Sequence, residues 1–495
     1  MRTAIIGGGI SGLTAAFELT KARAAGAKLD YTLFEARNKL GGPLASEIVD
    51  GSVLERGPDS FLTEKPAAAE LCRELGLGAD LIPSNDAARK TYIVVKNRLV
   101  ALPDGLMFLV PTKLIPTATT RLFSWTTKLR MGMELLHPPR PSGDSDEAVA
   151  ALVERHFGAE AVDRLADPLL SGIYGGDAAQ LSARTVLPRL VEMESEFGSL
   201  TRGMLAAHRK MRAIAAARKN GVARPTNAVG VTQPTVPGST FTTLRGGMQQ
   251  FIDALVARLD AGSVRSSTAV SGLERVAAGW KVEAAGNAEI FDAVIMAAPA
   301  WAAAVLLGKV DALLGEELGS IPYSSSITVN LIYDEARIGQ LPNGFGFLVP
   351  ASEKRAMLAC TFVHRKFLGR TAPGKAVLRA FLGGVRNEAL LAESDESLVR
   401  TVRRELAEIL GGNVIGLEIE PEHTQVSRWR RAMAQYAVGH KQRIERIAAR
   451  VAELPGLRLA GNAYDGIGIP DCIRLGRKAA KELATLSQSA GQLVS

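Results

Sequence analysis

The stretch Ala4-Ile5-Ile6-Gly7-Gly8-Gly9-Ile10-Ser11-Gly12 decides the fold of this chain. A short apolar run leads into Gly7, Gly9 and Gly12, which have the spacing G-x-G-x-x-G, and small, helix-forming residues follow from Leu13 to Thr20. A strand, a glycine turn and a helix in this order place a dinucleotide pyrophosphate at the helix N-terminus. The N-terminus therefore predicts a dinucleotide-binding α/β unit.

The residues after this unit indicate which dinucleotide it binds. Tyr31 to Phe34 reads as a second strand, and Glu35 at its end has the spacing of a carboxylate that binds ribose hydroxyls. A second glycine pair, Gly41 and Gly42, follows six residues later. A flavin needs such close backbone approach because its chain continues beyond the ribose. The pattern resembles the FAD-binding motif of the amine oxidase superfamily of flavoproteins.

The C-terminus supports a flavin domain built from both chain ends. Leu457 to Asn462 reads as a strand, and a helix is expected from Ile469, with Pro470 in its first turn. Such a helix start would cap a flavin edge that gains negative charge on reduction. Because no second strand–GxGxxG–helix unit is found, the sequence favours an oxidase that passes electrons to oxygen or a quinone.

Composition excludes several classes of protein. The chain has 495 residues, 47% of them hydrophobic, with a net charge of +8. Its three cysteines and six histidines have neither disulfide nor metal-ligand spacing, so we expect no metal site. No targeting segment, membrane-spanning run or nucleic-acid module is evident. We expect a cytoplasmic protein, and the positive charge suits an anionic substrate or anionic lipid headgroups.

The expected fold class is α/β, or α+β over the whole chain. It comprises a Rossmann-like FAD-binding domain (1–90, 242–310 and 425–495), a mixed-sheet substrate-binding domain (91–101, 222–241 and 311–424) and a helical subdomain (102–221). Within the last, Leu102 to Met133 joins apolar and basic residues. Two interpretations remain open for it: a surface on the inner face of the cell membrane, or an ordinary packed helical unit.

Local patterns predict the remaining elements. Helices are expected over 144–157, 203–220, 248–259 and 393–410, and strands over 327–333, 344–349, 357–363 and 376–382. Residues 171–177 are expected to form a loop, and 222–238 a linker.

Four motifs sharpen the resemblance. In chain order they are 55–61 (Glu-Arg-Gly-Pro-Asp-Ser-Phe), 172–177 (Gly-Ile-Tyr-Gly-Gly-Asp), 244–247 (Leu-Arg-Gly-Gly) and 466–473 (Gly-Ile-Gly-Ile-Pro-Asp-Cys-Ile). Together they resemble the protoporphyrinogen and coproporphyrinogen III oxidase family, over nearly the whole chain. For FAD, the resemblance implies Gly7, Gly9, Ile10, Ser11, Gly12, Glu35, Ala36, Arg37, Gly41, Gly42, Gly57, Pro58, Asp59, Ser60, Val270, Trp429, Gly461, Asn462, Ile467, Gly468 and Ile469. For the tetrapyrrole it implies Gly175, Leu331 and Phe362, although plain core packing is an equal alternative for Leu331 and Phe362.

The implied function is FAD-dependent oxidation of a porphyrinogen to a porphyrin in haem biosynthesis, with protoporphyrinogen IX as the first expectation. Coproporphyrinogen III is the alternative, because the stretch from Thr91 to Val94 looks more like that of bacterial members that take it. An amine oxidase, a carotenoid desaturase and a non-catalytic binding protein are further alternatives. The expected partners are the porphyrinogen, oxygen or a quinone, a peripheral membrane contact and a second copy in a homodimer. We assign no catalytic acid or base, because positioning the activated macrocycle is expected to suffice.

Overall fold

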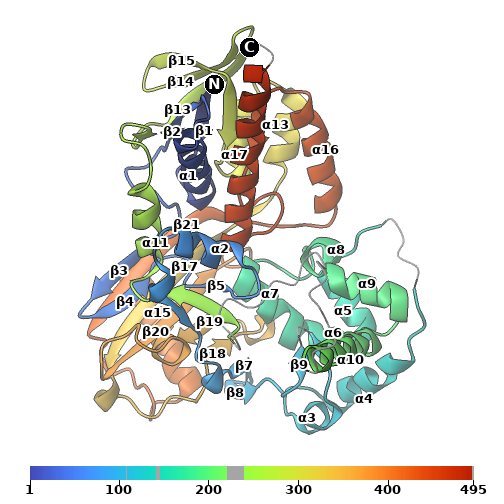
Figure 1. Ribbon diagram of the computed structural model, residues 1–495. Coiled ribbons are helices and arrows are strands. Elements are labelled where there is room, and N and C mark those ends of the chain that lie inside the picture. Colours follow the sequence, from blue (N-terminus) through green and yellow to red (C-terminus); the bar gives the residue numbers. More distant parts are fainter. Residues whose placement is uncertain (108, 141–144, 220–238, 493–495) are drawn as a thin grey trace.

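The computed structural model describes residues 1–107, 109–140, 145–219 and 239–492. Figure 1 shows an upper part that holds both chain ends, a sheet at the lower left and a group of helices at the lower right. The predicted linker over 222–238 lies outside the described residues. Residue 144 also lies outside them, but residues 145–148 are described and are not helical, so the helix predicted over 144–157 begins only at Val149. The mixed α/β class predicted from the sequence is confirmed.

The upper part is built around a parallel five-stranded sheet with the order β12-β2-β1-β16-β22. Its central strands β1 (Arg2–Ile6) and β16 (Ala293–Met296) are almost wholly buried, and β22 (Leu457–Leu459) brings in the C-terminal segment. The other strands are β2 (Asp30–Phe34) and β12 (Val264–Arg265). Both ends of the chain therefore form one sheet, as the sequence predicts.

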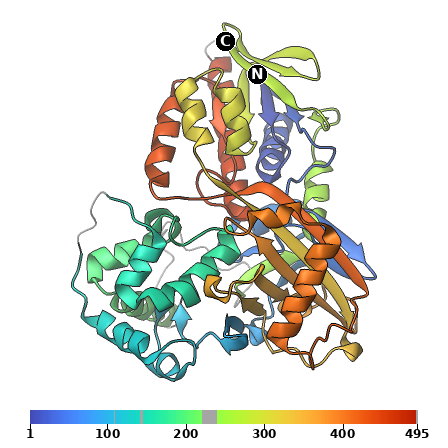
Figure 2. The same cartoon turned by 180° about the vertical axis from the view of Figure 1, so that it is seen from behind.

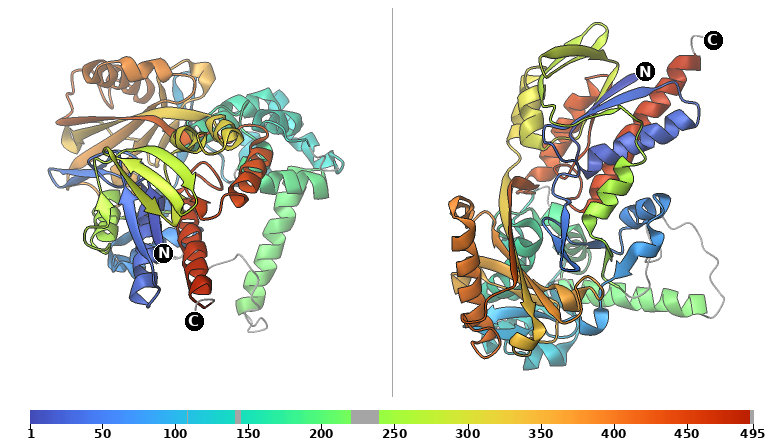
Figure 3. Two further views of the ribbon diagram at one scale, coloured as in Figure 1. Left: turned by 90° about the horizontal axis from the view of Figure 1, so that it is seen from above. Right: turned by 90° about the vertical axis from the view of Figure 1, so that its left-hand side faces the viewer.

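Two helices from opposite ends of the chain pack side by side on this sheet. They are α1 (Ile10–Ala24) and α17 (Ile469–Gln492), which lie together in Figures 1 and 3. A Cβ added at Gly476 of α17 would lie 2.3 Å from the carbonyl oxygen of Ser11, so the two backbones come close. The antiparallel strands β13 (Val270–Val276), β14 (Gly279–Ala284) and β15 (Asn287–Phe291) pack elsewhere on the same core.

The lower sheet has seven strands in the order β21-β17-β20-β19-β18-β7-β8. Its strands are β21 (His423–Ala434), β17 (Tyr323–Asp334), β20 (Lys375–Gly383), β19 (Met357–Phe362), β18 (Gly346–Leu348), β7 (Thr91–Val95) and β8 (Arg98–Ala101). Helix α15 (Asp395–Leu410) covers the outer face, as Figure 2 shows, and its apolar residues share one core with that face. β21 extends this sheet past the predicted boundary at residue 425.

The helical group has its own apolar core. Its helices include α3 (Leu114–Thr119), α4 (Trp125–Met133), α5 (Val149–Phe157), α7 (Asp167–Tyr174), α8 (Ala183–Val186), α9 (Pro188–Phe197) and α10 (Leu200–Lys219). Figure 3 shows α10 extending away from the other helices. A short hairpin of β9 (Leu106–Met107) and β10 (Val110–Pro111) precedes α3.

Most predicted elements exist, but their ends differ. The loop predicted over 171–177 begins only at Gly175, because residues 171–174 complete α7. The helix predicted to run to Leu259 is α11 (Met248–Val256), which ends earlier. Among the described residues, no helix has the length and apolar character needed to cross a bilayer.

Candidate functional site

The glycine turn joins β1 directly to α1. A Cβ added at Gly12 would lie 1.9 Å from the carbonyl oxygen of Gly7, so only glycine allows the helix to pack there. A Cβ at Gly9 would meet nothing within 4 Å. Gly9 is the N-cap of α1, whose first turn, which includes Ile10 and Ser11, carries no acidic residue. The free N–H groups and the positive end of the helix dipole therefore suit an anionic group at Gly9.

Glu35 links the second strand to this turn. Its carboxylate accepts hydrogen bonds from the backbone N–H groups of Gly8, at 2.7 Å, and Arg37, at 2.8 Å. The Thr268 N–H donates to the carbonyl oxygen of Glu35, which brings the half-buried Val270 into the neighbourhood. Ala36 and Arg37 are exposed. The structure thus brings these predicted ribose and adenine residues together beside the glycine turn.

The second glycine pair lies against the first. The Gly41 N–H donates to the carbonyl oxygen of Gly8 at 2.8 Å, and Gly9 and Gly41 form a parallel bridge. A Cβ at Gly42 would have only the Gly9 Cα as a near neighbour, at 3.5 Å. Two glycine segments about thirty residues apart in the sequence therefore face each other with little side-chain volume between them, which suits a long, phosphate-containing cofactor.

The carbonyl groups of residues 55–57 are bound by side chains of the lower sheet. Asn330 donates to the Glu55 oxygen at 3.0 Å, Thr328 and Trp429 donate to the Arg56 oxygen at 2.8 and 2.7 Å, and Arg379 donates to the Gly57 oxygen. Sequence reasoning selected Trp429 and Gly57 but missed these other donors, which we identify only from the structure. The usable signal was the alternation of Thr328 and Asn330 with apolar residues in an otherwise buried strand.

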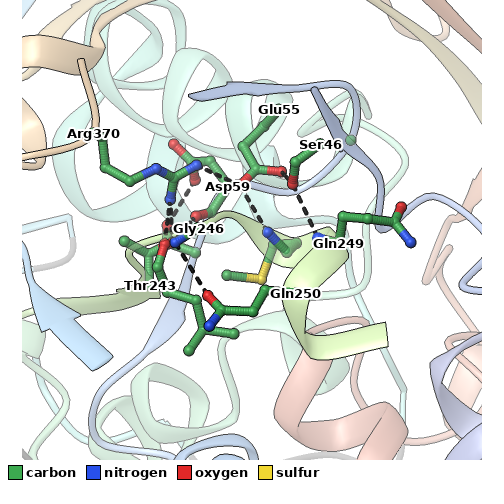
Figure 4. A network of polar contacts seen from close by, with 12 residues as sticks. Ser46, Glu55, Asp59, Thr243, Gly246, Gln249, Gln250 and Arg370 are labelled. Carbon is green, nitrogen blue, oxygen red and sulfur yellow. Dashed lines mark hydrogen bonds and ion pairs between the residues drawn. The ribbon is translucent and has the colours of Figure 1, made fainter. Parts of the chain in front are cut away.

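A buried ion pair holds the same segment from the other side (Figure 4). The Arg370 guanidinium contacts the Glu55 carboxylate at 2.5 Å, and both side chains are almost fully buried. Ser46 and the Met248 N–H also donate to this carboxylate. Burial raises the pKa of Glu55, and Arg370 acts against this shift. Arg370 also donates to Thr243, so β4 (Ser52–Glu55) is tied to β11 (Phe241–Leu244) and to the start of α11.

Asp59 and Ser60, which were also predicted to bind the cofactor, make side-chain contacts within the protein. The Asp59 carboxylate lies 3.0 Å from the Lys366 ammonium and 3.7 Å from the Arg379 guanidinium, and Ser60 donates to it. These partners hold the pKa of Asp59 well below its usual range, against the effect of burial. Pro58 is exposed. The side chain of Asp59 is thus occupied, so any cofactor contact would involve its backbone.

The C-terminal residues converge on the start of α17. Asn462 donates to the Ala432 carbonyl at 2.9 Å, and its own carbonyl accepts a hydrogen bond from the Tyr436 hydroxyl at 2.9 Å. Gly461 lies just after β22, and Ile467, Gly468 and Ile469 lead into the helix. The Asp471 carboxylate in the first turn pairs with Lys65 at 2.7 Å.

Two of the predicted substrate residues lie elsewhere. Leu331 and Phe362 are fully buried in the core between the lower sheet and α15. Side chains alternate along a strand, so these two face away from the side that carries Thr328 and Asn330. We therefore correct their assignment to core packing. Gly175 remains beside the sheet, where Leu348 would contact a Cβ added at Gly172 of α7 and Leu358 would contact one added at Gly384.

Residues 10–484 match the model of the flavin containing amine oxidoreductase family. The chain belongs to this family. It is 33% identical over 484 residues to "Coproporphyrinogen III oxidase" of Bacillus subtilis, covering 97% of both chains. It is 31% identical to "Protoporphyrinogen oxidase" of Bos taurus, covering 96% of this chain and 97% of the relative.

Solved structures agree with this membership. A putative protoporphyrinogen oxidase from Exiguobacterium has a TM-score of 0.82 and 31% identity and covers 98% of both chains. Cyclohexylamine oxidase from Brevibacterium oxydans, at 16% identity and a TM-score of 0.66, shares the fold. The chain is therefore an FAD-dependent oxidoreductase. Among the described residues, no group of three or more His, Cys, Asp or Glu side chains is arranged to hold a metal ion.

Proposed function

We propose that the protein oxidises a porphyrinogen to the porphyrin in haem biosynthesis, with coproporphyrinogen III as its substrate. The observation that carries the proposal is the full-length similarity to curated relatives of that name, at 33% identity in Bacillus subtilis and 31% in Staphylococcus aureus. The choice revises the sequence-based preference for protoporphyrinogen IX. That compound is the second candidate, supported by the bovine relative.

For the cofactor, we propose that the two facing glycine segments hold FAD. The pyrophosphate would bind at Gly9 in front of α1, Glu35 would bind the ribose, and the isoalloxazine ring would lie beside Gly57 and Trp429. The absence of side-chain volume at Gly9 and Gly42 supports this arrangement. The start of α17 near Gly468 would face the same ring with its positive dipole end. FAD would accept a hydride from the substrate.

For the substrate, we propose that the macrocycle lies next to Gly175, on the side of the lower sheet that carries Thr328. Each oxidation removes two electrons and two hydrogens, so three turnovers convert the porphyrinogen to the porphyrin. Oxygen or a quinone is the proposed final acceptor. The protein's part is to orient the flat substrate and to exclude water, for which the apolar Leu348 and Leu358 are suited.

A comparison of both substrates tests the proposal. Purified protein is supplied with coproporphyrinogen III or protoporphyrinogen IX in air, and the fluorescence of the porphyrin is followed, with consumption of oxygen as a second readout. Formation of coproporphyrin III above the rate without enzyme is expected. Faster oxidation of protoporphyrinogen IX would make that compound the substrate in place of coproporphyrinogen III. The absence of enzymatic porphyrin formation from both compounds would refute the proposed function.

We also propose a peripheral contact with anionic lipid through α3, α4 and the turn after them. This surface exposes five large apolar side chains between 50% and 81%, namely Ile115, Trp125, Leu129, Met133 and Leu136. Basic side chains lie among them, and the Lys128 ammonium sits 4.5 Å from the Trp125 ring centroid. Apolar residues surrounded by cations are typical of helices that lie in a membrane interface.

Vesicle sedimentation tests the lipid contact. The Leu129→Glu variant is expected to bind vesicles of phosphatidylglycerol about tenfold more weakly than the unchanged protein, because it removes apolar area and adds a negative charge. Leu417→Glu, at a residue 55% exposed on another surface, is the matched control. Equal binding by both variants would remove the proposal.

A further inference from the structure

Tyr174 and Gly175, together called the Tyr174–Gly175 wall, lie where the helical group meets the lower sheet and the upper part of the molecule. The Tyr174 carbonyl accepts hydrogen bonds from the Ser324 hydroxyl at 3.0 Å and the Gln435 amide at 2.6 Å. The Gly175 carbonyl accepts one from the Val385 N–H at 2.9 Å. The wall is thus attached to the lower sheet and to the C-terminal segment, although it belongs to the helical group.

Space around the wall is tight. Gly175 ends α7 with φ of +58°, and a Cβ there would lie 2.9 Å from the Ser324 hydroxyl oxygen. A Cβ at Gly384 would lie 2.9 Å from the Gly175 carbonyl oxygen, and 3.2 Å from Leu358. A small displacement of α7 relative to residues 384–386 would therefore move the wall against the sheet.

One arginine holds α7 in place relative to residues 384–386. The Arg386 guanidinium binds both carboxylate oxygens of Asp167, at 2.5 and 2.9 Å, and the Asp177 carboxylate at 2.8 Å. Asp167 begins α7 and is buried, and Asp177 lies just beyond the wall. Arg386 therefore contacts the chain on both sides of Tyr174 and Gly175. A planar, bidentate pair with a buried carboxylate has defined geometry and exceeds an ordinary surface ion pair in strength.

We propose that Arg386 is a positioning residue that sets the distance between the Tyr174–Gly175 wall and the lower sheet, and thereby the fit of the porphyrinogen. This inference rests on the proposed function, which places the macrocycle at Gly175. Arg386 acts through the wall, since its guanidinium is occupied by the two aspartates and is not free to bind a substrate carboxylate.

Three variants separate positioning from simple stabilisation. Arg386→Gln removes the charge, Arg386→Lys keeps the charge without the bidentate geometry, and Asp177→Asn weakens one contact and leaves Asp167 paired. Lys375→Gln is the matched control, because Lys375 is paired with Glu422 at the start of β20, the strand that ends three residues before Arg386. KM and kcat for coproporphyrinogen III are measured on the FAD-loaded fraction, together with the Kd of the product porphyrin by quenching of its fluorescence.

The expected result is a rise of about tenfold in KM and product Kd for Arg386→Gln, with kcat within about twofold. Arg386→Lys and Asp177→Asn are expected to show smaller rises, and Lys375→Gln none. Unchanged KM and Kd in every variant, with only a lower Tm or FAD content, would overturn the inference. If Arg386→Gln does not fold, unchanged KM in the other two variants would overturn it equally. An unchanged protein that neither binds nor oxidises any porphyrinogen would instead refute the proposed function.

Discussion

Replacing Arg370 by methionine should destabilise the protein strongly, because it leaves the Glu55 carboxylate buried without a countercharge. Both side chains are at most 3% exposed. The change also removes the donors to Thr243 and to the Leu244 carbonyl. Breaking a buried ion pair by removing one partner costs about 3–5 kcal/mol. The double variant Glu55→Gln/Arg370→Met should recover about 1–3 kcal/mol of this, since no charge is left buried.

The loss of unfolding free energy caused by Arg370→Met (the deficit) should depend on pH in a defined direction. Burial raises the pKa of Glu55, and Arg370 opposes that rise, so the pKa should move further above the ordinary value of 4.5 once Arg370 is lost. A group whose pKa is higher in the folded state stabilises the fold below its unfolded pKa and loses that contribution as pH rises through the folded pKa. The deficit of Arg370→Met should therefore be smaller near pH 5 than at pH 8.

Urea unfolding at these two pH values, followed by far-UV circular dichroism and flavin fluorescence, measures the deficit. Agreement between the two probes is needed before free energies are compared. Arg428→Met is the matched control, because its pair with Asp395 is exposed and should contribute less than about 1 kcal/mol. A deficit for Arg370→Met below about 1 kcal/mol at both pH values would refute the reasoning.

Two further predictions concern the glycine turn and the helical group. Gly9→Ala should leave Tm nearly unchanged but lower the FAD content, because the added Cβ meets no atom of the protein. Gly12→Ala should lower both Tm and FAD content, since its Cβ would lie 1.9 Å from the Gly7 carbonyl oxygen. Equal FAD content in Gly9→Ala and the unchanged protein would contradict this prediction. His156 lies 2.9 Å from Glu134 and 3.1 Å from Glu194, and these partners raise its pKa above 6.5 despite burial. Its stabilisation should be present below pH 6.5 and lost as pH rises through the raised pKa, so the Tm difference between the unchanged protein and His156→Gln should shrink from pH 6 to pH 9; a difference that grows would contradict it.

The local glycine and strand patterns were sufficient for the dinucleotide unit. Gly7, Gly9, Gly12 and Glu35 lie within one continuous segment, and their geometry follows from short-range rules for turns and helix starts. The addition of β22 to the same sheet, with α17 packed on it, could be predicted because the C-terminal strand is mostly apolar and the helix start is marked by a proline in its first turn. The boundaries were less accurate, since the ends of α7 and α11 depend on tertiary contacts.

The contacts between the parts could not be predicted in this way. Leu331 and Phe362 looked suitable for an apolar pocket, but only the pairing of β17 with its neighbours decides which face of the sheet they occupy. Thr328 and Arg379 donate to carbonyl groups about 270 and 320 residues earlier in the chain. No local pattern encodes such partners, because they arise when the lower sheet packs on residues 55–57.

Reduction of the bound flavin in the absence of oxygen tests the central claim most directly. Purified FAD-loaded protein is mixed in a stopped-flow instrument with coproporphyrinogen III and separately with protoporphyrinogen IX, and the absorbance of oxidised flavin is followed. The account predicts rapid bleaching, faster with coproporphyrinogen III, and appearance of the porphyrin. A flavin that stays oxidised with both substrates would contradict porphyrinogen oxidation while leaving the family assignment in place.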